Sequence, residues 1–195
     1  MGLGLSVNGQ NWGTERGIIL GRLATNENDG PQSFDVPLEF LKRQIRRRTL
    51  SQASSDTLPA FIKPVTPKQF RAGVYRSNDE LAAECLGLNP ETAVFVSEPV
   101  TLRAEVRGFV LDGRVLDAAI YEGEANAADA EALVTALASE ISLLRAVVVD
   151  VGLIDVRGWG VIECNAAWGA GLNGCDPNKV LAAIVAASEP TSEAH

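Results

Sequence analysis

Two apolar runs that each end in an acidic residue stand close together near the end of the chain. The first run, Val147–Val149, is followed by Asp150. The second, Val161–Ile162, is followed by Glu163 and, two residues later, by Asn165. A short polar turn separates the runs, which is typical of the two strands of a β-hairpin. We therefore expect three oxygen-bearing side chains to gather at one end of a sheet, with Glu163 and Asn165 on the same strand face.

Carboxylates that end apolar strands need a partner, because burying an unpaired charge is costly. Hard cations such as Mg²⁺ bind carboxylate and amide oxygens together with the phosphate oxygens of a bound nucleotide. The pattern therefore predicts a metal–nucleotide site. The alternative is a structural ion pair, for example between Asp150 and Arg157.

Length and charge limit the classes of function. A chain of 195 residues can form one sizeable domain or two small ones that share a core. Its net charge of −8 argues against non-specific nucleic-acid binding as the main role. The basic run Lys42–Arg48 is a local exception. We interpret it as the exposed face of a helix, and a contact with nucleic acid is the alternative.

The cysteines and the histidine exclude other chemistry. Cys85, Cys164 and Cys175 lack metal-ligand spacing, which indicates reduced thiols in a cytoplasmic protein. The first residues lack a signal-peptide pattern, and no apolar run approaches the roughly 20 residues needed to span a bilayer. His195, the last residue, is the only histidine, so histidine-based catalysis is not expected.

The remaining pattern predicts an α+β fold with antiparallel sheets flanked by helices. Asp112-Gly113 is a strong hairpin signal between two apolar stretches. Residues 1–35 are expected to be loops with one strand near 17–20, residues 51–57 a linker and residues 189–195 a frayed tail. Helices are expected at 36–50, 77–86, 127–144 and 177–188, and strands at 59–64, 69–75, 92–96, 102–111, 115–121, 145–154 and 158–164.

Two lysines are candidates for binding phosphate. Lys63 closes an apolar strand before Pro64, and Lys68 follows in a turn that leads to Gly73. A buried stem with its ammonium at the sheet edge can hold phosphate oxygens, and the turn could cover them. A solvated charge at a strand end is the alternative for Lys63.

Three further residues suit the rest of a nucleotide. Glu98 follows an apolar run, and it is either a strand terminus or a hinge whose backbone meets an adenine ring. Glu105 and Arg107 lie two residues apart and so share a strand face. The carboxylate can accept ribose hydroxyls and the arginine can grip phosphate, unless the two pair with each other or across the strand.

The order of these residues resembles the ATP-grasp superfamily over about residues 59–185. Glu105 follows Glu98 by seven positions and Glu163 follows Asp150 by thirteen, as in members similar to D-alanine–D-alanine ligase. Glu-x-Asn is the family's terminal metal motif. The segments 61–64 and 105–110 most resemble a clade of small bacterial and phage ATP-grasp proteins that is named for two arginines and a lysine.

The resemblance implies an ATP-grasp fold, in which two small α+β subdomains with antiparallel sheets enclose a nucleotide cleft. Residues 1–58 would form a reduced N-terminal segment, residues 59–97 a lid-like subdomain and residues 98–188 the large subdomain of a domain that spans 59–188. It further implies that ATP and Mg²⁺ bind, with Lys63 and Arg107 as catalytic residues. The implied contacts are Lys63 and Lys68 with phosphates, the backbone of Val96, Ser97 and Glu98 with adenine, Glu105 with ribose, Arg107 with the phosphates or an acyl phosphate, and Asp150, Glu163 and Asn165 with Mg²⁺.

By the same resemblance we expect an ATP- and Mg²⁺-dependent carboxylate–amine (or carboxylate–thiol) ligase that acts through an acyl phosphate on small-molecule or peptide substrates. Such chemistry needs no histidine. An inactive ATP-binding module that acts through partners is the alternative, and a nucleic-acid-associated protein using the arginine-rich helix is a third hypothesis.

Two features depart from the family pattern. Only about 60 residues precede the Lys63 strand, where ATP-grasp enzymes have an α/β domain. Val148 also replaces an arginine two residues before the metal-binding Asp, so Arg107 or Arg103 would have to supply that charge.

Overall fold

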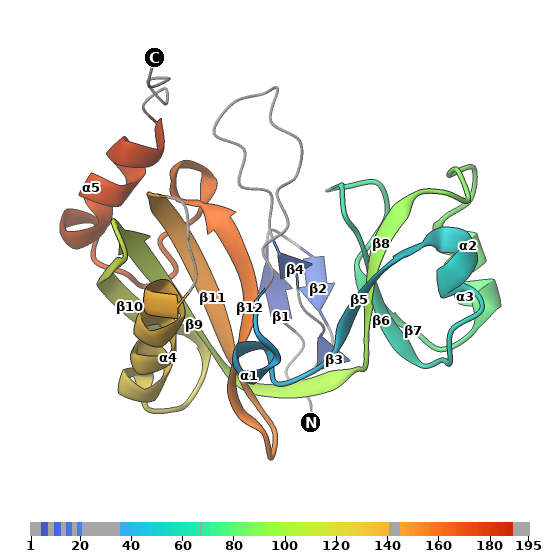
Figure 1. Ribbon diagram of the computed structural model, residues 1–195, viewed down its shortest axis with the longest axis horizontal. Coiled ribbons are helices and arrows are strands. Elements are labelled where there is room, and N and C mark those ends of the chain that lie inside the picture. The colour runs from blue at the N-terminus through green and yellow to red at the C-terminus, as the bar shows by residue number, and fades with distance from the viewer. Residues whose placement is uncertain are drawn as a thin grey trace. The chain divides into compact units, whose positions relative to one another are not determined.

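The computed structural model describes residues 5–7, 10–12, 15–16, 19–20, 36–66, 68–140 and 145–188 (Figure 1). The chain divides into two units. Unit 1 holds residues 1–19 and 43–102, and unit 2 holds residues 20–42 and 103–195. Residues 43–58, which the sequence assigned to an N-terminal segment, thus cluster with the predicted lid-like subdomain in unit 1.

Unit 1 is built on a four-stranded sheet with the order β5-β8-β6-β7 and antiparallel pairings. Its strands are β5 (Ile45–Thr49), β6 (Ala60–Pro64), β7 (Gly73–Tyr75) and β8 (Ala93–Ser97), and its helices are α2 (Leu50–Ala53) and α3 (Asn78–Glu84). The Ser77 hydroxyl caps α3 by accepting from the backbone N–H of Glu80, as the sequence predicted. Two short strand pairs complete the unit. In the first, β1 (Leu5–Val7) pairs with β2 (Gln10–Trp12). In the second, β3 (Glu15–Arg16) pairs with the start of β9.

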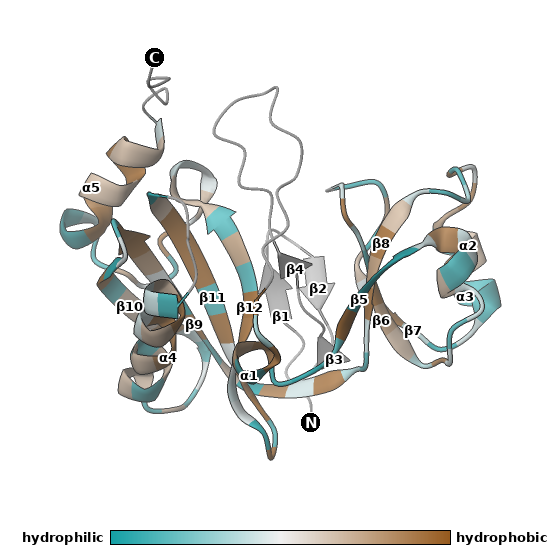
Figure 2. Ribbon diagram, in the orientation of Figure 1, coloured by the Kyte–Doolittle hydropathy of each residue, from teal (hydrophilic) through white to brown (hydrophobic). Residues whose placement is uncertain are grey.

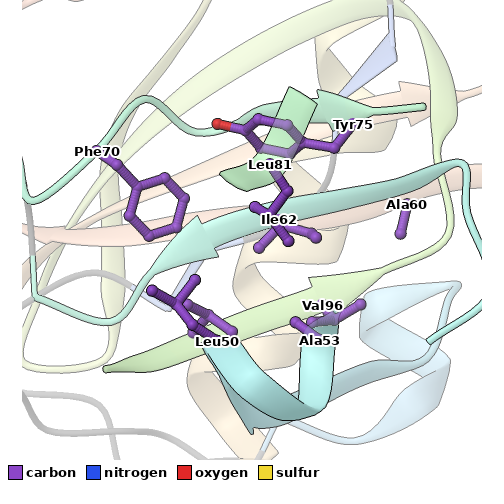
Figure 3. Close-up of a cluster of buried hydrophobic side chains, with 9 residues drawn as sticks. Leu50, Ala53, Ala60, Ile62, Phe70, Tyr75, Leu81 and Val96 are labelled. Carbon is purple, nitrogen blue, oxygen red and sulfur yellow. The ribbon is translucent and has the colours of Figure 1, made fainter. Parts of the chain in front are cut away.

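The core of unit 1 lies on one face of this sheet (Figure 3). Ile62 of β6 is fully buried at its centre, with Tyr75 and Leu81 on one side of it and α2 on the other. The cluster consists of Leu50, Ala53, Ala60, Ile62, Phe70, Tyr75, Leu81, Val94 and Val96. The Tyr75 hydroxyl donates to the Arg71 carbonyl, so its polar end is satisfied.

The helix predicted over residues 36–50 is wrong. A four-residue helix, α1 (Leu38–Leu41), ends at Lys42, whose φ of 57° lies in the left-handed region. The basic run then continues as β5, which pairs with β8, and Arg43 is only 2% exposed. The expected linker at 51–57 also contains most of α2, which begins with a capping box between Thr49 and Gln52. Pairing with β8 outweighs the helical spacing of the apolar residues, because all five residues of β5 lie in register with β8 and gain ladder hydrogen bonds along that side.

Unit 2 is built on the larger sheet, in the order β10-β9-β11-β12-β4 with β3 also paired to β9. Its strands are β4 (Ile19–Leu20), β9 (Val100–Leu111), β10 (Arg114–Gly123), β11 (Ala146–Ile154) and β12 (Gly158–Ala166). The Asp112-Gly113 hairpin is confirmed, and both residues have positive φ, 48° and 75°, as a two-residue hairpin turn requires. Figure 2 shows the central strands β9 and β11 as largely hydrophobic, as expected of strands that are covered on both faces.

Two helices cover this sheet, one on each face. Gly108 of β9 lies under α4 (Ala127–Glu140), where an added Cβ would meet the Val134 side chain at 3.3 Å. On the other face, Phe109 and Val148 form a cluster with Ala183 and other residues of α5 (Pro177–Ser188). A short 3-10 helix, η1 (Ala167–Gly169), connects β12 to the segment before α5.

Several predicted segments lie partly outside the described residues: 17–18 of the first strand, 141–144 of the α4 helix and the tail 189–195. The stretch 1–16, expected to be loops, includes the three short strands β1, β2 and β3, and of the strand predicted over 69–75 only Gly73–Tyr75 forms. The remaining predicted strands and helices are confirmed within a few residues. The described helices include none that is long and apolar enough to cross a membrane.

Gly123, at the end of β10, is expected to tolerate no side chain. Its φ is 69°, and an added Cβ would lie 2.0 Å from the Arg103 carbonyl oxygen. Gly158 of the same unit has a φ of 82° but open space around it. Gly158→Ala should therefore cost about 1–2 kcal/mol of unfolding free energy, from left-handed strain alone, and Gly123→Ala clearly more. Urea unfolding of the two variants measures the difference, and equal costs would contradict the steric argument.

Asp117 of β10 is expected to hold the start of α5 in a pH-dependent way. Its carboxylate accepts from the Lys179 ammonium and from the Asp176 backbone N–H, both at 2.8 Å. Burial opposes ionisation, but these contacts prevail and lower the pKa of Asp117 below its ordinary 3.8. The contribution is therefore present above pH 4 and is lost as the pH falls through the lowered pKa. Asp117→Asn should reduce the free energy of unfolding at pH 6, and this loss should shrink progressively as the pH falls below 4; a loss that stays constant with pH would refute this assignment.

Candidate functional site

The β11–β12 hairpin brings Asp150, Glu163 and Asn165 to one face of the sheet of unit 2. Asp150 lies directly opposite Glu163, and Val148 lies opposite Asn165. Opposed residues in an antiparallel pair point to the same face, as do residues two apart on one strand. The hairpin and the gathering of the three oxygen-bearing side chains, both predicted from the sequence, are present in the structure.

An extra residue in β12 creates this arrangement. Val151 pairs with Val161, but Asp150 pairs with Glu163, so Ile162 forms a β-bulge. If the regular pairing from the turn continued, Ile162 would lie opposite Asp150. Glu163 and Asn165 would then point to the other face. The bulge is therefore the feature that puts both of them beside Asp150.

The three side chains differ in burial and contacts. Asp150 is only 2% exposed, whereas Glu163 and Asn165 are half-buried. The Asn165 amide nitrogen donates to Glu163 Oε1 at 2.7 Å, which directs the amide oxygen away from that carboxylate. Among the described residues, no group of three or more His, Cys, Asp and Glu side chains is arranged to hold a metal. The predicted set contains two carboxylates and one amide.

The partner of Asp150 is Arg107 of β9. Arg107 Nε donates to Asp150 Oδ1 at 2.8 Å and Nη2 donates to Oδ2 at 2.6 Å, and the arginine is only 6% exposed. Arg157, which we considered as a partner of Asp150, donates to the Lys42 carbonyl. Arg103, the other arginine considered beside the metal site, contacts Asp155 at 3.1 Å. Arg107 is thus the arginine that faces Asp150.

The ionisation of Asp150 depends on the charges around it, and a nearby cation would change it. Burial, the largest effect, and then the charge of Glu163 raise the pKa of Asp150 above its ordinary value, although the Arg107 contact lowers it. Two carboxyl groups that face each other in a buried place disfavour double ionisation. A cation bound between them would favour it, which is the electrostatic condition for a metal site.

Glu105 and Tyr121 extend the site along β9 and β10. The Tyr121 hydroxyl donates to Glu105 Oε2 at 2.6 Å, and the Arg107 guanidinium carbon lies 5.7 Å from the centre of the tyrosine ring. Burial and the neighbouring carboxylates raise the pKa of Tyr121 well above its ordinary value, so the hydroxyl remains a donor. Glu105 is 1% exposed, and its carboxylate accepts from the Tyr121 hydroxyl.

The remaining predicted residues belong to unit 1. Lys63 is half-buried on β6, and Lys68 is exposed with a φ of 67°. Val96 packs in the core, so only its backbone is available, while the Ser97 hydroxyl donates to the carbonyl of the exposed Glu98. These last three residues border a cavity of about 320 Å³ in unit 1. The predicted nucleotide residues therefore fall into two sets, one in each unit.

Sequence reasoning missed two candidate residues. Arg47 of β5 and Lys63 of β6 both lie opposite Phe95 of β8, so the two cations share one face of the unit 1 sheet. Arg47 was missed because its segment was assigned to a helix. The signature Thr49-x-x-Gln52, a capping box, could have marked the start of a new helix and excluded the longer one. Tyr121 had no such signal, because two bulges in β10 determine its position.

Comparisons with known proteins place these features in a family. A family model matches residues 40–183, about three-quarters of the chain. It describes an ATP-grasp domain, family 2 of the clade that is named for two arginines and a lysine. No curated protein matches significantly.

Two solved structures show the same fold, and a third aligns over a similar share of this chain. A RimK domain ATP-grasp protein from Sphaerobacter thermophilus is similar with a TM-score of 0.56 and 17% identity, over 77% of this chain and 60% of that one. D-alanine–D-alanine ligase from Bacillus anthracis has a TM-score of 0.50 and 16% identity, over 75% and 61%. The ATP-grasp ligase PsnB, in complex with a minimal precursor, has a TM-score of 0.48 and 17% identity, over 75% and 55%.

The chain thus spans somewhat more than half the length of these structures. The α+β architecture with antiparallel sheets, predicted from the sequence, is confirmed by the fold and by the family match. On this evidence the chain belongs to the ATP-grasp superfamily, in the second family of the clade named for two arginines and a lysine.

Proposed function

We propose that this protein is an ATP- and Mg²⁺-dependent ligase that joins a carboxylate to an amine or a thiol. The observation that supports this most is the juxtaposition of Asp150, Glu163 and Asn165 on one sheet face, in a chain of the ATP-grasp superfamily. The substrates would be small-molecule or peptide carboxylates and amines. The free thiols of the three cysteines and the need for ATP agree with a cytoplasmic location.

The donor set fits magnesium. Asp150, Glu163 and Asn165 supply carboxylate and amide oxygens, the ligands that Mg²⁺ prefers when phosphate oxygens and water complete its shell. When bound, Mg²⁺ would neutralise charge on the phosphates during phosphoryl transfer. Burial, and after it the charge of Glu163, raise the pKa of Asp150, and a bound cation would favour the ionised form of both carboxyl groups.

The other residues would bind the nucleotide. Lys63 and Lys68 would contact the phosphates, with Arg47 as a further cation on the Lys63 face. The backbone of Val96–Glu98 would bind adenine, and Glu105, oriented by the Tyr121 hydroxyl, would accept the ribose hydroxyls. The contact of Arg107 with the phosphates stays a prediction.

The reaction would proceed in two displacements. A carboxylate oxygen of the substrate attacks the γ-phosphorus of ATP, the bond to the β-phosphate oxygen breaks, and ADP leaves. The amine nitrogen, or a thiol sulfur, then attacks the acyl carbon, and inorganic phosphate leaves. In both steps the protein contributes positioning and charge stabilisation.

The first prediction concerns ligand binding. ATP with Mg²⁺ should stabilise the wild-type protein by about 1–3 kcal/mol at saturation, as ligands that bind only the folded state do. Glu163→Ala should lose this stabilisation, while Glu131→Ala, on the exposed surface of α4, should keep it. Thermal unfolding with ATP, with and without Mg²⁺, measures the effect. No Mg²⁺-dependent shift in the wild type would count against ATP binding altogether.

The second prediction separates a ligase from a module that only binds ATP. With the right carboxylate, ATP and hydroxylamine, the protein should form a hydroxamate and release ADP, because hydroxylamine intercepts an acyl phosphate. Glu163→Ala should reduce this rate at least about 100-fold, since it removes a group that would hold the metal. Screening amino acids and peptides by ADP release identifies the carboxylate. Mg²⁺-dependent ATP binding without ADP release from any candidate would favour the inactive module.

A further inference from the structure

The guanidinium of Arg107 donates hydrogen bonds in two directions. Nε and Nη2 bind the two oxygens of Asp150, and Nη1 donates to the Gly171 carbonyl at 2.8 Å. We infer that Arg107 is a positioning residue that couples the carboxylate of Asp150 to the segment 167–175, which follows the Glu-x-Asn motif. The part that concerns metal binding rests on the proposed function.

The backbone of Arg107 holds the same segment. Its carbonyl accepts from the Cys175 thiol at 3.4 Å, so one residue contacts residues 171 and 175 through two different groups. The thiol stays protonated, because burial raises the pKa of Cys175 to about 11. The segment is closed at its end by the Cys175 N–H, which donates to the Leu172 carbonyl at 3.0 Å. Arg107 thus ties the middle and the end of the segment to β9.

Only an arginine satisfies this geometry. A planar fork can present two parallel donors to a carboxylate and a third to a carbonyl, whereas a lysine ammonium is a point donor. Tyr121 lies beside the guanidinium, with its ring centre 5.7 Å from Cζ, and its hydroxyl is held by Glu105. The orientation of the fork is therefore supported from β10 as well.

The position of Arg107 explains why Val148 can be apolar. Val148 packs in the cluster under α5 with Phe109 and Ala183, where a charge would be buried. Arg107 reaches Asp150 from the neighbouring strand instead, and in doing so its third donor meets Gly171. The metal-site carboxylate and the segment after the motif consequently share one guanidinium.

Two substitutions test the coupling from its two ends. Arg107→Lys keeps a positive charge beside Asp150 but loses the fork. Asp150→Asn keeps Arg107 and a side chain of nearly the same shape at position 150, but it removes the negative charge that orients the guanidinium. Arg103→Lys is the matched control, four residues earlier on β9 and 67% exposed.

Hydrogen exchange of the Cys175 amide reports on the segment, and the Cys85 amide, bonded to the Leu81 carbonyl in unit 1, is the reference.

Exchange of the Cys175 amide should become at least about tenfold faster in Arg107→Lys and also in Asp150→Asn, with the Cys85 amide unchanged. The response to Asp150→Asn is decisive, because a purely local role of Arg107 would leave the segment unaffected. Binding of Mn²⁺ in the presence of ATP, followed by electron paramagnetic resonance, should weaken about 10–100-fold in Arg107→Lys and not in Arg103→Lys.

The exchange of the Cys175 amide and the binding of Mn²⁺ test different parts of the inference. Wild-type exchange of the Cys175 amide in Asp150→Asn would overturn the coupling, whatever the metal result. Unchanged Mn²⁺ affinity in Arg107→Lys would overturn the positioning of Asp150 for the metal. If the wild-type protein binds no Mn²⁺ with ATP, the proposed function fails. The exchange measurement then still decides whether Arg107 couples Asp150 to the segment.

Discussion

The ion pair of Arg107 and Asp150 is the interaction around which unit 2 arranges its polar residues. Both side chains are almost fully buried, and leaving either one alone would strand a charge inside the protein at a cost of several kcal/mol. Bidentate geometry and the added bond to Gly171 satisfy the arginine. Tyr121 lies beside the guanidinium and donates to Glu105. A mostly apolar sheet can hold this polar group because its members satisfy one another.

Irregularities in two hairpins make this group possible. In β10, counting back from the Asp112-Gly113 turn without bulges would place Ile120 opposite Glu105 and send Tyr121 to the opposite face. Register shifts near Leu116 and Tyr121 correct this and bring the tyrosine to Glu105. The bulge at Ile162 does the same for Glu163 and Asn165 in β12. Bulges that redirect side chains next to a site are a recurrent device in sheets.

The sequence predicted most elements of unit 2 well, because its signals are local and agree with one another. Asp112-Gly113 specifies a hairpin turn, the valine runs specify buried strands, and α4 and α5 are rich in alanine with helical spacing. The prediction failed at 36–50, where the spacing of Leu38, Leu41 and Ile45 matched a helix. The partner that turns Ile45–Thr49 into a strand is β8, more than 40 residues away, and no local pattern reports it.

The sequence by itself determined which residues could form the site. Two apolar runs end in an acid and in Glu-x-Asn, and the order of the lysines and acids upstream indicates the ATP-grasp superfamily, which the family match supports. The tertiary structure alone decided that Asp150 and Glu163 face each other and that Arg107 holds Asp150. The reason is physical. Residue types and spacing are carried along the chain, but a one-residue change of register reverses the face of every later side chain, and register depends on packing across the whole sheet.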